Sequence, residues 1–213
     1  MNQSESWVET QLKPVLRHFE RHRQIGILGG NFNPVHMGHL LIADQVVQQL
    51  GLERVYLMPE AIPPHIDTKS TISSKHRLNM LELAIAGNHR LGIELIELQN
   101  GGMNYTFDTM KQLKKMNPEV DYYFIVGADM VSYLPKWHRI DELVELVQFV
   151  GVRRLDYPEE AKYPVTWVDI PKVDFSSTRI REWIVAGNSP DYLVPELVAQ
   201  YIQEKRLYLD GNE

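Results

Sequence analysis

The sequence predicts an α/β domain built on a doubly wound, mostly parallel sheet with helices on both faces. Short apolar runs alternate with segments of helical periodicity along most of the chain. The 213 residues are enough for one large core, and 44% of them are apolar, as in ordinary globular domains. No repeat, low-complexity tract or linker divides the chain. Strand–helix alternation of this kind gives a parallel sheet that is covered on both faces.

The first strand and helix are predicted on either side of a glycine pair. The apolar run QIGILGG (24–30) ends in two glycines and is typical of a buried strand. Residues 38–51 then carry apolar side chains at helical spacing, and Gly51 is a C-terminal stop signal. The run RVYLMP (54–59) is predicted to be the next strand.

The same alternation continues to the C-terminus. Residues 73–87 open with serines that can cap a helix, and Pro118 ends the helix that comes before it. The further predicted helices are 73–87, 106–118, 140–147, 176–187 and 194–208, and the further predicted strands are 91–98, 121–129, 148–154 and 165–170. Residues 60–72 and 155–164 are expected to be long surface loops.

Residues 1–23 precede the first strand and are predicted to be an N-terminal extension. Their apolar residues have helical spacing that Pro14 interrupts, so we expect an appended helix or tail. Residues 24–213 are predicted to form a single domain.

Composition excludes several classes of protein. With no cysteine, the chain has no disulfide, no thiolate catalysis and no thiolate metal site. A net charge of −6 argues against a general nucleic-acid binder, which needs a basic face. No apolar run approaches the roughly 18 residues of a membrane span, and no secretion signal is present. We therefore expect a cytoplasmic protein without nucleic-acid or membrane partners, and a homo-oligomer is compatible with the sequence.

The stretch GILGGNFNPVHMGHL (26–40) has the features of a phosphate-binding turn. Glycines follow the predicted strand, and a helix begins near Gly38. Such a turn exposes backbone N–H groups and directs the positive end of the helix dipole at a ligand, and glycine lets a phosphate approach closely. Neither GxxxxGK[ST] nor GxGxxG is present, so the anion must be held differently.

His36 and His39 supply that difference. At positions i and i+3 they share one helix face, so both imidazoles are expected to point outward at one ligand. An imidazole donates to phosphate oxygens and is easily charged beside an anion. Two alternatives stay open: the histidines cap the helix or fill the crevice, or they bind zinc. HxxH lacks the spacing and the glutamate of the zinc motif HExxH.

A second stretch, FSSTRIRE (175–182), opens a helix near the C-terminus. Three hydroxyls, with Ser177 and Thr178 among them, lie at the predicted helix N-terminus, and Arg179 and Arg181 follow. The two arginines are two residues apart and do not share a face, so only one should reach the anion. The alternative is an N-cap followed by solvated arginines.

Together these stretches resemble a known family. GGNFNPVHMGH is similar to the first signature of the HxGH nucleotidyltransferases, and FSSTRIR to their second. The segments IPPH, RLNMLELA, NYTFDT, VGADM and LPKWHRIDEL resemble the bacterial nicotinate-nucleotide adenylyltransferases. The resemblance covers residues 24–208. It implies a Rossmann-like sheet and the transfer of AMP from ATP to nicotinate mononucleotide, giving deamido-NAD and pyrophosphate.

The chain departs from the family pattern at four positions. Asn31 replaces the usual threonine and Asn33 the usual aspartate, but both keep a polar side chain that suits a turn. Ile66 stands where a lysine is common, and Lys69 is a candidate to replace that charge. His138 occupies a position that is often aromatic.

The resemblance implies a role for each matching residue. The catalytic candidates are His36, His39 and Arg181. The candidate ATP-binding residues are Gly29, Gly30, Phe32, His36, Gly38, His39, Gly127, Asp129, Ser177, Thr178 and Arg181. The candidates for the nicotinate mononucleotide are Asn31, Tyr105, Thr106, Met130 and Trp137. Mg²⁺ is expected to accompany ATP with mostly water ligands and no direct protein ligand. The alternative for Trp137 and Tyr105 is packing in the core, and Asp108 is an alternative helix cap.

The implied reaction needs no general base, because the attacking phosphate is already ionised near neutral pH. Alignment and charge compensation would carry the catalysis. The alternatives are another HxGH transferase such as pantetheine-phosphate adenylyltransferase or a CTP-dependent relative, a nucleotide-binding regulator without turnover, and a fragment of a class I aminoacyl-tRNA synthetase. The length, the acidity and the lack of a KMSKS-like run count against the last.

Overall fold

The computed structural model describes residues 22–62, 71–153, 161–171 and 173–209. Within these ranges, six strands form one sheet in the order β3-β2-β1-β4-β5-β6, and all neighbouring strands are parallel. The strands are β1 (Arg23–Gly30), β2 (Arg54–Pro59), β3 (Leu91–Ile93), β4 (Val120–Gly127), β5 (Val147–Val152) and β6 (Val165–Val168). The strand order reverses between β1 and β4, where sheets of this type bind ligands. The predicted doubly wound fold is therefore confirmed.

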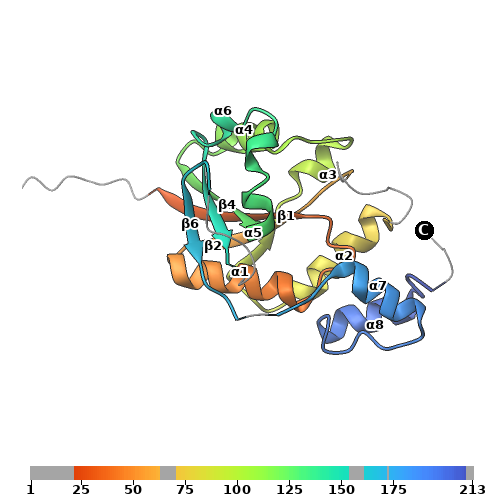
Figure 1. Ribbon diagram of the computed structural model, residues 1–213. Helices are drawn as coiled ribbons and strands as arrows, with labels where there is room; N and C mark the ends of the chain where they lie inside the picture. Colours follow the sequence, from red (N-terminus) through yellow and green to blue (C-terminus); the bar gives the residue numbers. More distant parts are fainter. Residues whose placement is uncertain (1–21, 63–70, 154–160, 172, 210–213) are drawn as a thin grey trace, which may run out of the picture.

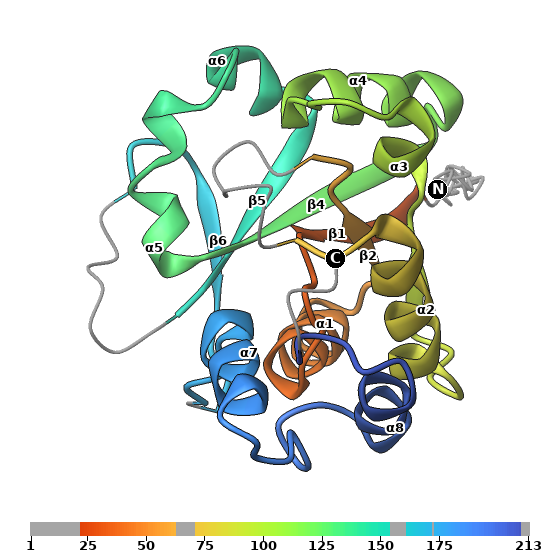
Figure 2. The same ribbon diagram turned by 90° about the vertical axis from the view of Figure 1, so that its right-hand side faces the viewer.

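Helices cover both faces of the sheet (Figure 1). On one face lie α1 (Met37–Leu50), α2 (Ser74–Ile85), α7 (Ser177–Val185) and α8 (Glu196–Glu204). On the other lie α3 (Ile96–Asn100), α4 (Thr106–Met116), α5 (Ala128–Val131), the 3₁₀ turn η2 (Leu134–Lys136) and α6 (Ile140–Leu143). Seen in Figure 2, α7 and α8 lie beside the start of α1, although they are far from it in sequence.

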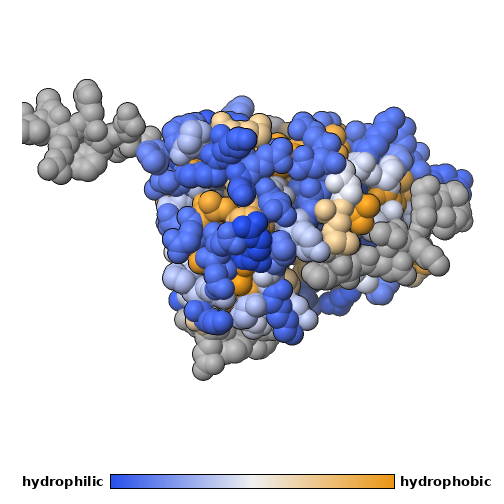
Figure 3. Space-filling view, turned by 90° about the horizontal axis from the view of Figure 1, so that it is seen from above, coloured by the Kyte–Doolittle hydropathy of each residue, from blue (hydrophilic) through white to orange (hydrophobic). Residues whose placement is uncertain are grey.

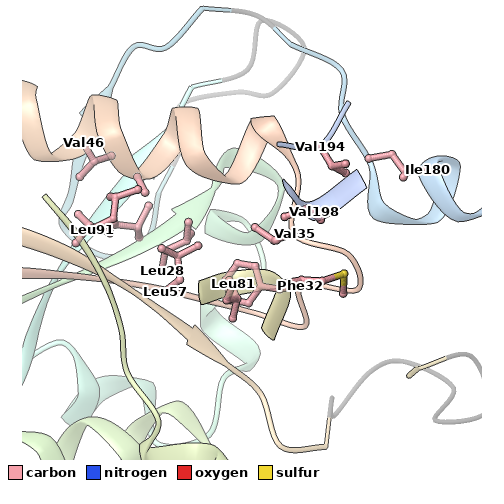
Figure 4. Packing of buried hydrophobic residues seen from close by; sticks show 14 of the residues in the cluster. Leu28, Phe32, Val35, Val46, Leu57, Leu81, Leu91, Ile180, Val194 and Val198 are labelled. Atoms are coloured by element: carbon pink, nitrogen blue, oxygen red, sulfur yellow. The ribbon is translucent and has the colours of Figure 1, made fainter. Parts of the chain in front are cut away.

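Two apolar cores hold these layers together. Along β1, the side chain of Leu28 enters one core, while Ile25 and Ile27 enter the core on the opposite face. Figure 4 shows part of the first core, in which Leu28 lies beside Leu57 and Leu81 lies near Phe32, with α1 above them. The outer surface seen in Figure 3, on the side of the second core, is mainly hydrophilic with scattered apolar residues. No helix in the described ranges is both long enough and apolar enough to cross a bilayer.

Several predicted boundaries differ from the observed ones. The predicted strand 91–98 ends at Ile93, because Glu94 then accepts a hydrogen bond from the amide of Ile96 and α3 begins. The predicted strand 121–129 ends at Gly127, and α5 follows.

The predicted helix 140–147 is only one turn long, from Ile140 to Leu143, since Val147 already pairs with Tyr122 in the sheet. Strand β1 begins at Arg23, one residue before the predicted domain start. The predicted helix or tail in residues 1–23 lies, apart from its last two residues, outside the described residues.

Candidate active site

The turn between β1 and α1, residues 31–36, is the centre of the candidate site, and we call it the elbow. Its geometry is unusual at Phe32, which has a positive φ of 50°. The ring of Phe32 is 2% exposed and lies under Gly30, where an added Cβ would be 3.3 Å from it. The side chain of Phe32 therefore belongs to the core, and only its backbone can take the predicted ATP-binding role.

His36 and His39 cap α1 reciprocally. The Nδ1 of His36 accepts from the amide of His39 at 3.3 Å, and the Nδ1 of His39 accepts from the amide of His36 at 3.2 Å. The rings are stacked, with centroids 3.6 Å apart. The capping alternative is thus confirmed, but it occupies only one nitrogen of each ring.

These contacts fix the protonation of both imidazoles. Because each Nδ1 accepts a backbone hydrogen, the proton of each neutral ring lies on Nε2. Desolvation, and then the nearby His36, lower the pKa of His39 well below its ordinary value. The expectation of an easily charged pair is therefore corrected for His39 in the free protein. Among the described residues its Nε2 meets no acceptor, so it is available to a ligand.

The start of α7 lies against the elbow. Ser177 Oγ donates to the carbonyl of Pro34 at 2.9 Å, and Arg181 Nη1 donates to the carbonyl of Asn33 at 2.8 Å. A further nitrogen of Arg181 lies 3.3 Å from the hydroxyl of Thr178. Arg179 instead pairs with Asp174 in solvent. Of the two arginines only Arg181 reaches the elbow, as the spacing predicted.

Gly38 is needed where the helix begins. A Cβ at this position would lie 3.1 Å from His36 Nδ1 and 3.1 Å from the Cβ of Phe175. Phe175 is the first residue of the second motif and packs near the His36 ring, with centroids 6.0 Å apart. The glycine therefore lets α1, the histidine pair and the α7 region come together.

A pocket of about 430 Å³ opens beyond the carboxyl ends of β1 and β4. Six of the predicted binding residues line it: Gly29, Tyr105, Thr106, Gly127, Met130 and Trp137. The pocket also contains Glu60, Asn104, Tyr133, Lys136 and His138, which the sequence did not single out as ligand-binding residues. They sit on loops and short turns, where periodicity gives no signal. The structure thus brings residues from three distant segments around one cavity.

The other ten predicted binding residues do not line this pocket, and Asn31 and Asp129 are among them. Asn31 turns toward Thr71, with its Nδ2 3.3 Å from Thr71 Oγ1. Asp129 was expected at the end of a strand but lies in the first turn of α5. Its Oδ1 is 2.5 Å from the place of an added Cβ on Gly127, so a larger residue at this position would require the Asp129 carboxylate to move.

Trp137 and Tyr105 both line this pocket. The Trp137 ring packs edge-on against Phe124 and Phe149 at 5.8 and 6.0 Å, so it is supported by the core while facing the pocket. Tyr105 is 47% exposed and its ring lies 4.5 Å from that of His138, so the core-packing alternative is wrong for Tyr105. A supported indole is well suited to stack on a flat ligand ring.

Helix α4 begins at this pocket. Tyr105 is its N-cap residue and makes no side-chain capping bond, so Asp108, the alternative, is not the N-cap. Below the turn, the buried Glu97 accepts a hydrogen bond from Thr109 at 3.0 Å, and Thr109 also contacts the Tyr105 carbonyl. Burial raises the pKa of Glu97 to about 7. No local pattern marked Glu97 as a buried acid, because it lies in a segment predicted as strand.

A family model described as cytidylyltransferase-like matches residues 27–183. A protein of Enterococcus faecalis named "Probable nicotinate-nucleotide adenylyltransferase" is 62% identical over 90% of this chain and 88% of its own length. A protein of Streptococcus mutans with the same name is 60% identical over 90% of this chain and 91% of its own length. The chain belongs to the nicotinate-nucleotide adenylyltransferase family.

Solved structures of this adenylyltransferase family share the fold. Nicotinic acid mononucleotide adenylyltransferase of Plasmodium falciparum, complexed with NaAD, matches with a TM-score of 0.75 at 21% identity. The match covers 88% of this chain and 98% of that chain. The same enzyme complexed with APC gives a TM-score of 0.73 with the same coverage.

Two inferences from the sequence stay predictions: the replacement of the charge lost at Ile66 and the binding of Mg²⁺ without a protein ligand. Ile66 and Lys69, the departure and its candidate replacement, lie outside the described residues. Within the described part of the chain, no three His, Asp or Glu side chains gather as a metal site would require.

Proposed function

We propose that this protein transfers AMP from ATP to nicotinate mononucleotide, with deamido-NAD and pyrophosphate as products. The observation that carries the proposal is that the elbow and the pocket lie next to each other where the strand order reverses. The elbow with Arg181 offers hydrogen-bond donors to phosphates, and the pocket with Trp137 offers an aromatic face to a flat ring. The names of the relatives at 56–62% identity support this assignment.

In the proposed reaction, a phosphate oxygen of the mononucleotide attacks the α-phosphorus of ATP. A new P–O bond forms, and the bond between the α-phosphorus and the bridging oxygen breaks as pyrophosphate leaves. Mg²⁺ enters as part of the ATP substrate. No proton needs to be removed from the nucleophile, so the protein must align the two phosphates and offset their charge.

The elbow suits this task. His39 offers a neutral Nε2–H toward the triphosphate, and Arg181, anchored on the Asn33 carbonyl, retains further N–H donors. Ser177 and Thr178 carry the other hydroxyls of the α7 start. Because these groups are fixed before the ligand arrives, little reorganisation is needed as charge moves onto the leaving group.

The pocket suits a pyridine ring that carries a carboxylate. Trp137 offers a face for stacking, and the N-terminus of α4 at Tyr105 and Thr106 favours a negative group. Lys136 adds a positive charge to the same wall. We therefore propose a preference for nicotinate over nicotinamide mononucleotide.

The experiment is a pyrophosphate-release assay with ATP at equal concentrations of nicotinate mononucleotide, nicotinamide mononucleotide and pantetheine phosphate, repeated with CTP. Release that is fastest with ATP and nicotinate mononucleotide is the expected result. Faster release with pantetheine phosphate would assign another transferase activity. Binding of ATP with no release from any acceptor would assign the regulator alternative.

A further inference from the structure

Four side chains from other parts of the chain donate hydrogen bonds to the elbow. We call Arg77, Ser177, Arg181 and Tyr208 the loop clamp. Arg77 Nη1 donates to the Asn31 carbonyl at 2.9 Å, and the Tyr208 hydroxyl donates to Asn33 Oδ1 at 2.9 Å. Ser177 and Arg181 belong to the second motif, whereas Arg77 on α2 and Tyr208 after α8 have no assigned role.

Arg77 is a buried cation. It is 1% exposed, and it contacts carbonyl oxygens: Asn31 at 2.9 Å and Ala61 at 3.4 Å. In the described ranges it forms no ion pair, and its Nε has no partner. The negative charge of Glu60 acts electrostatically on the Arg77 guanidinium. A buried charge with mainly dipolar partners costs free energy, and an anionic ligand at the elbow would offset that cost.

Tyr208 connects the two arginines of the clamp. Its phenol lies in the electric field of both Arg77 and Arg181, and burial raises its pKa, so it stays protonated and donates to Asn33. Arg181 holds the backbone carbonyl of the same residue. Side chain and carbonyl of Asn33 are thus fixed from two directions, by segments that are far apart in sequence.

We propose that Arg77 and Tyr208 are positioning residues for the triphosphate, which hold the elbow in the conformation that binds ATP. The inference rests on the proposed function for the identity of the ligand. Neither residue needs to touch the substrate. Arg77 fixes the start of the elbow and adds a positive charge beneath it, and Tyr208 fixes the orientation of the Asn33 side chain.

The first test compares Tyr208→Phe with Tyr201→Phe. Tyr201 is a matched control, because its hydroxyl also joins α8 to neighbouring residues, His76 at 2.9 Å and Asn79 at 2.8 Å, but does not contact the elbow. We expect Tyr208→Phe to raise the Kd for Mg-ATP by about fivefold, the effect of one lost hydrogen bond, and to lower kcat. The KM for nicotinate mononucleotide should not change. Tyr201→Phe should lower Tm only.

The second test concerns Arg77. Arg77→Lys keeps the charge but cannot bridge both carbonyls, and Arg77→Met removes the charge at similar volume. Both should weaken Mg-ATP binding in a calorimetric titration without the second substrate, and Arg77→Met should also lower kcat by about tenfold or more. If Arg77→Met does not fold, Mg-ATP binding by Arg77→Lys and by Tyr208→Phe still tests the positioning role.

The proposal is overturned if Tyr208→Phe binds Mg-ATP within about twofold of Tyr201→Phe, or if Arg77→Lys binds it like the wild type. Either result would make the clamp a stabilising feature only. Because the titration uses ATP alone, it gives an answer even if the mononucleotide assay shows a different acceptor. Failure of the positioning role and failure of the proposed function are therefore distinguishable.

Discussion

The imidazole rings of His36 and His39 lie stacked at 3.6 Å with an interplanar angle of 18°, and each accepts the backbone hydrogen of the other residue. Two charged rings in this arrangement would repel, and each would set an N–H against an N–H. His39 is therefore arranged as a neutral hydrogen-bond donor through Nε2. Capping of α1 uses Nδ1 and leaves that nitrogen of His39 for the proposed ligand.

Removal of either side chain proposed to bind phosphate should lower turnover strongly. We expect His39→Ala and Arg181→Ala each to reduce kcat by about 10²–10³, by analogy with the loss of one oxyanion donor. Steady-state kinetics with pyrophosphate detection provides the measurement, and circular dichroism checks the fold. Near-normal turnover in a folded His39→Ala protein would contradict the role.

Turnover should not require a charged imidazole. Because the pKa of His39 is well below 6.5, the neutral form is present throughout the range above it. We expect kcat at saturating substrates to stay flat between about pH 6.5 and 8.5. A tenfold fall per pH unit across that range would show that imidazolium is needed.

The lowered pKa of His39 also makes the stability of the protein depend on pH. In the unfolded chain His39 binds a proton near pH 6.5, whereas the folded residue does not. The stability that the neutral, folded His39 contributes is therefore present above pH 6.5 and is lost as the pH falls below that value. Urea unfolding should therefore show the wild type losing stability relative to His39→Ala between pH 7.5 and about pH 5.5.

Glu97 should destabilise the protein at higher pH. Its folded pKa of about 7 exceeds the ordinary 4.5, so the folded state binds more protons and stability falls as pH rises through that window. Glu97→Gln keeps the acceptor for Thr109 and should be more stable than the wild type above pH 7, on the order of 2–3 kcal/mol. Chemical denaturation at pH 5 and pH 8 measures this. If the stability difference between Glu97→Gln and the wild type is the same at pH 5 and pH 8, the pKa of Glu97 is not raised.

Trp137 should affect one substrate selectively. We expect Trp137→Ala to raise the KM for nicotinate mononucleotide by about tenfold, through loss of aromatic stacking, and to leave the KM for ATP unchanged. Trp183→Ala is the control, because Trp183 is 51% exposed on α7 and lies outside the pocket. An equal effect of both substitutions would count against a stacking role.

Gly38 should be needed for activity and Gly51 for stability only. At Gly38 an alanine Cβ would press on His36 and Phe175 at 3.1 Å, so Gly38→Ala should displace the histidine and reduce kcat at least about tenfold. Gly51→Ala meets nothing within 4 Å but is strained at φ 64°, so it should cost about 1 kcal/mol of stability with normal kcat. Normal kcat in Gly38→Ala would show that the His36 position is not critical.

Long periodic segments were predictable, and short ones were not. Residues 38–51 and 106–118 have enough turns for the apolar spacing to identify helices, and both were confirmed within two residues. The one-turn helix α6 and the three-residue strand β3 are too short for periodicity to mark their ends. Their limits depend on sheet pairing, as at Val147 and Tyr122.

By itself, the sequence determined the alternation of strands and helices that makes the sheet. Its spacing predicted that only one of Arg179 and Arg181 would reach the elbow, and the resemblance to the family motif selected Arg181. Only the tertiary structure shows the lowered pKa of His39, the hydrogen bonds from Arg77 and Tyr208 to the elbow, and the pocket that Trp137 lines. Burial and contacts between residues as far apart as Asn33 and Tyr208 arise only when the chain is folded, and no local pattern encodes them. Desolvation, which sets the charge of a buried group, is a property of that packing.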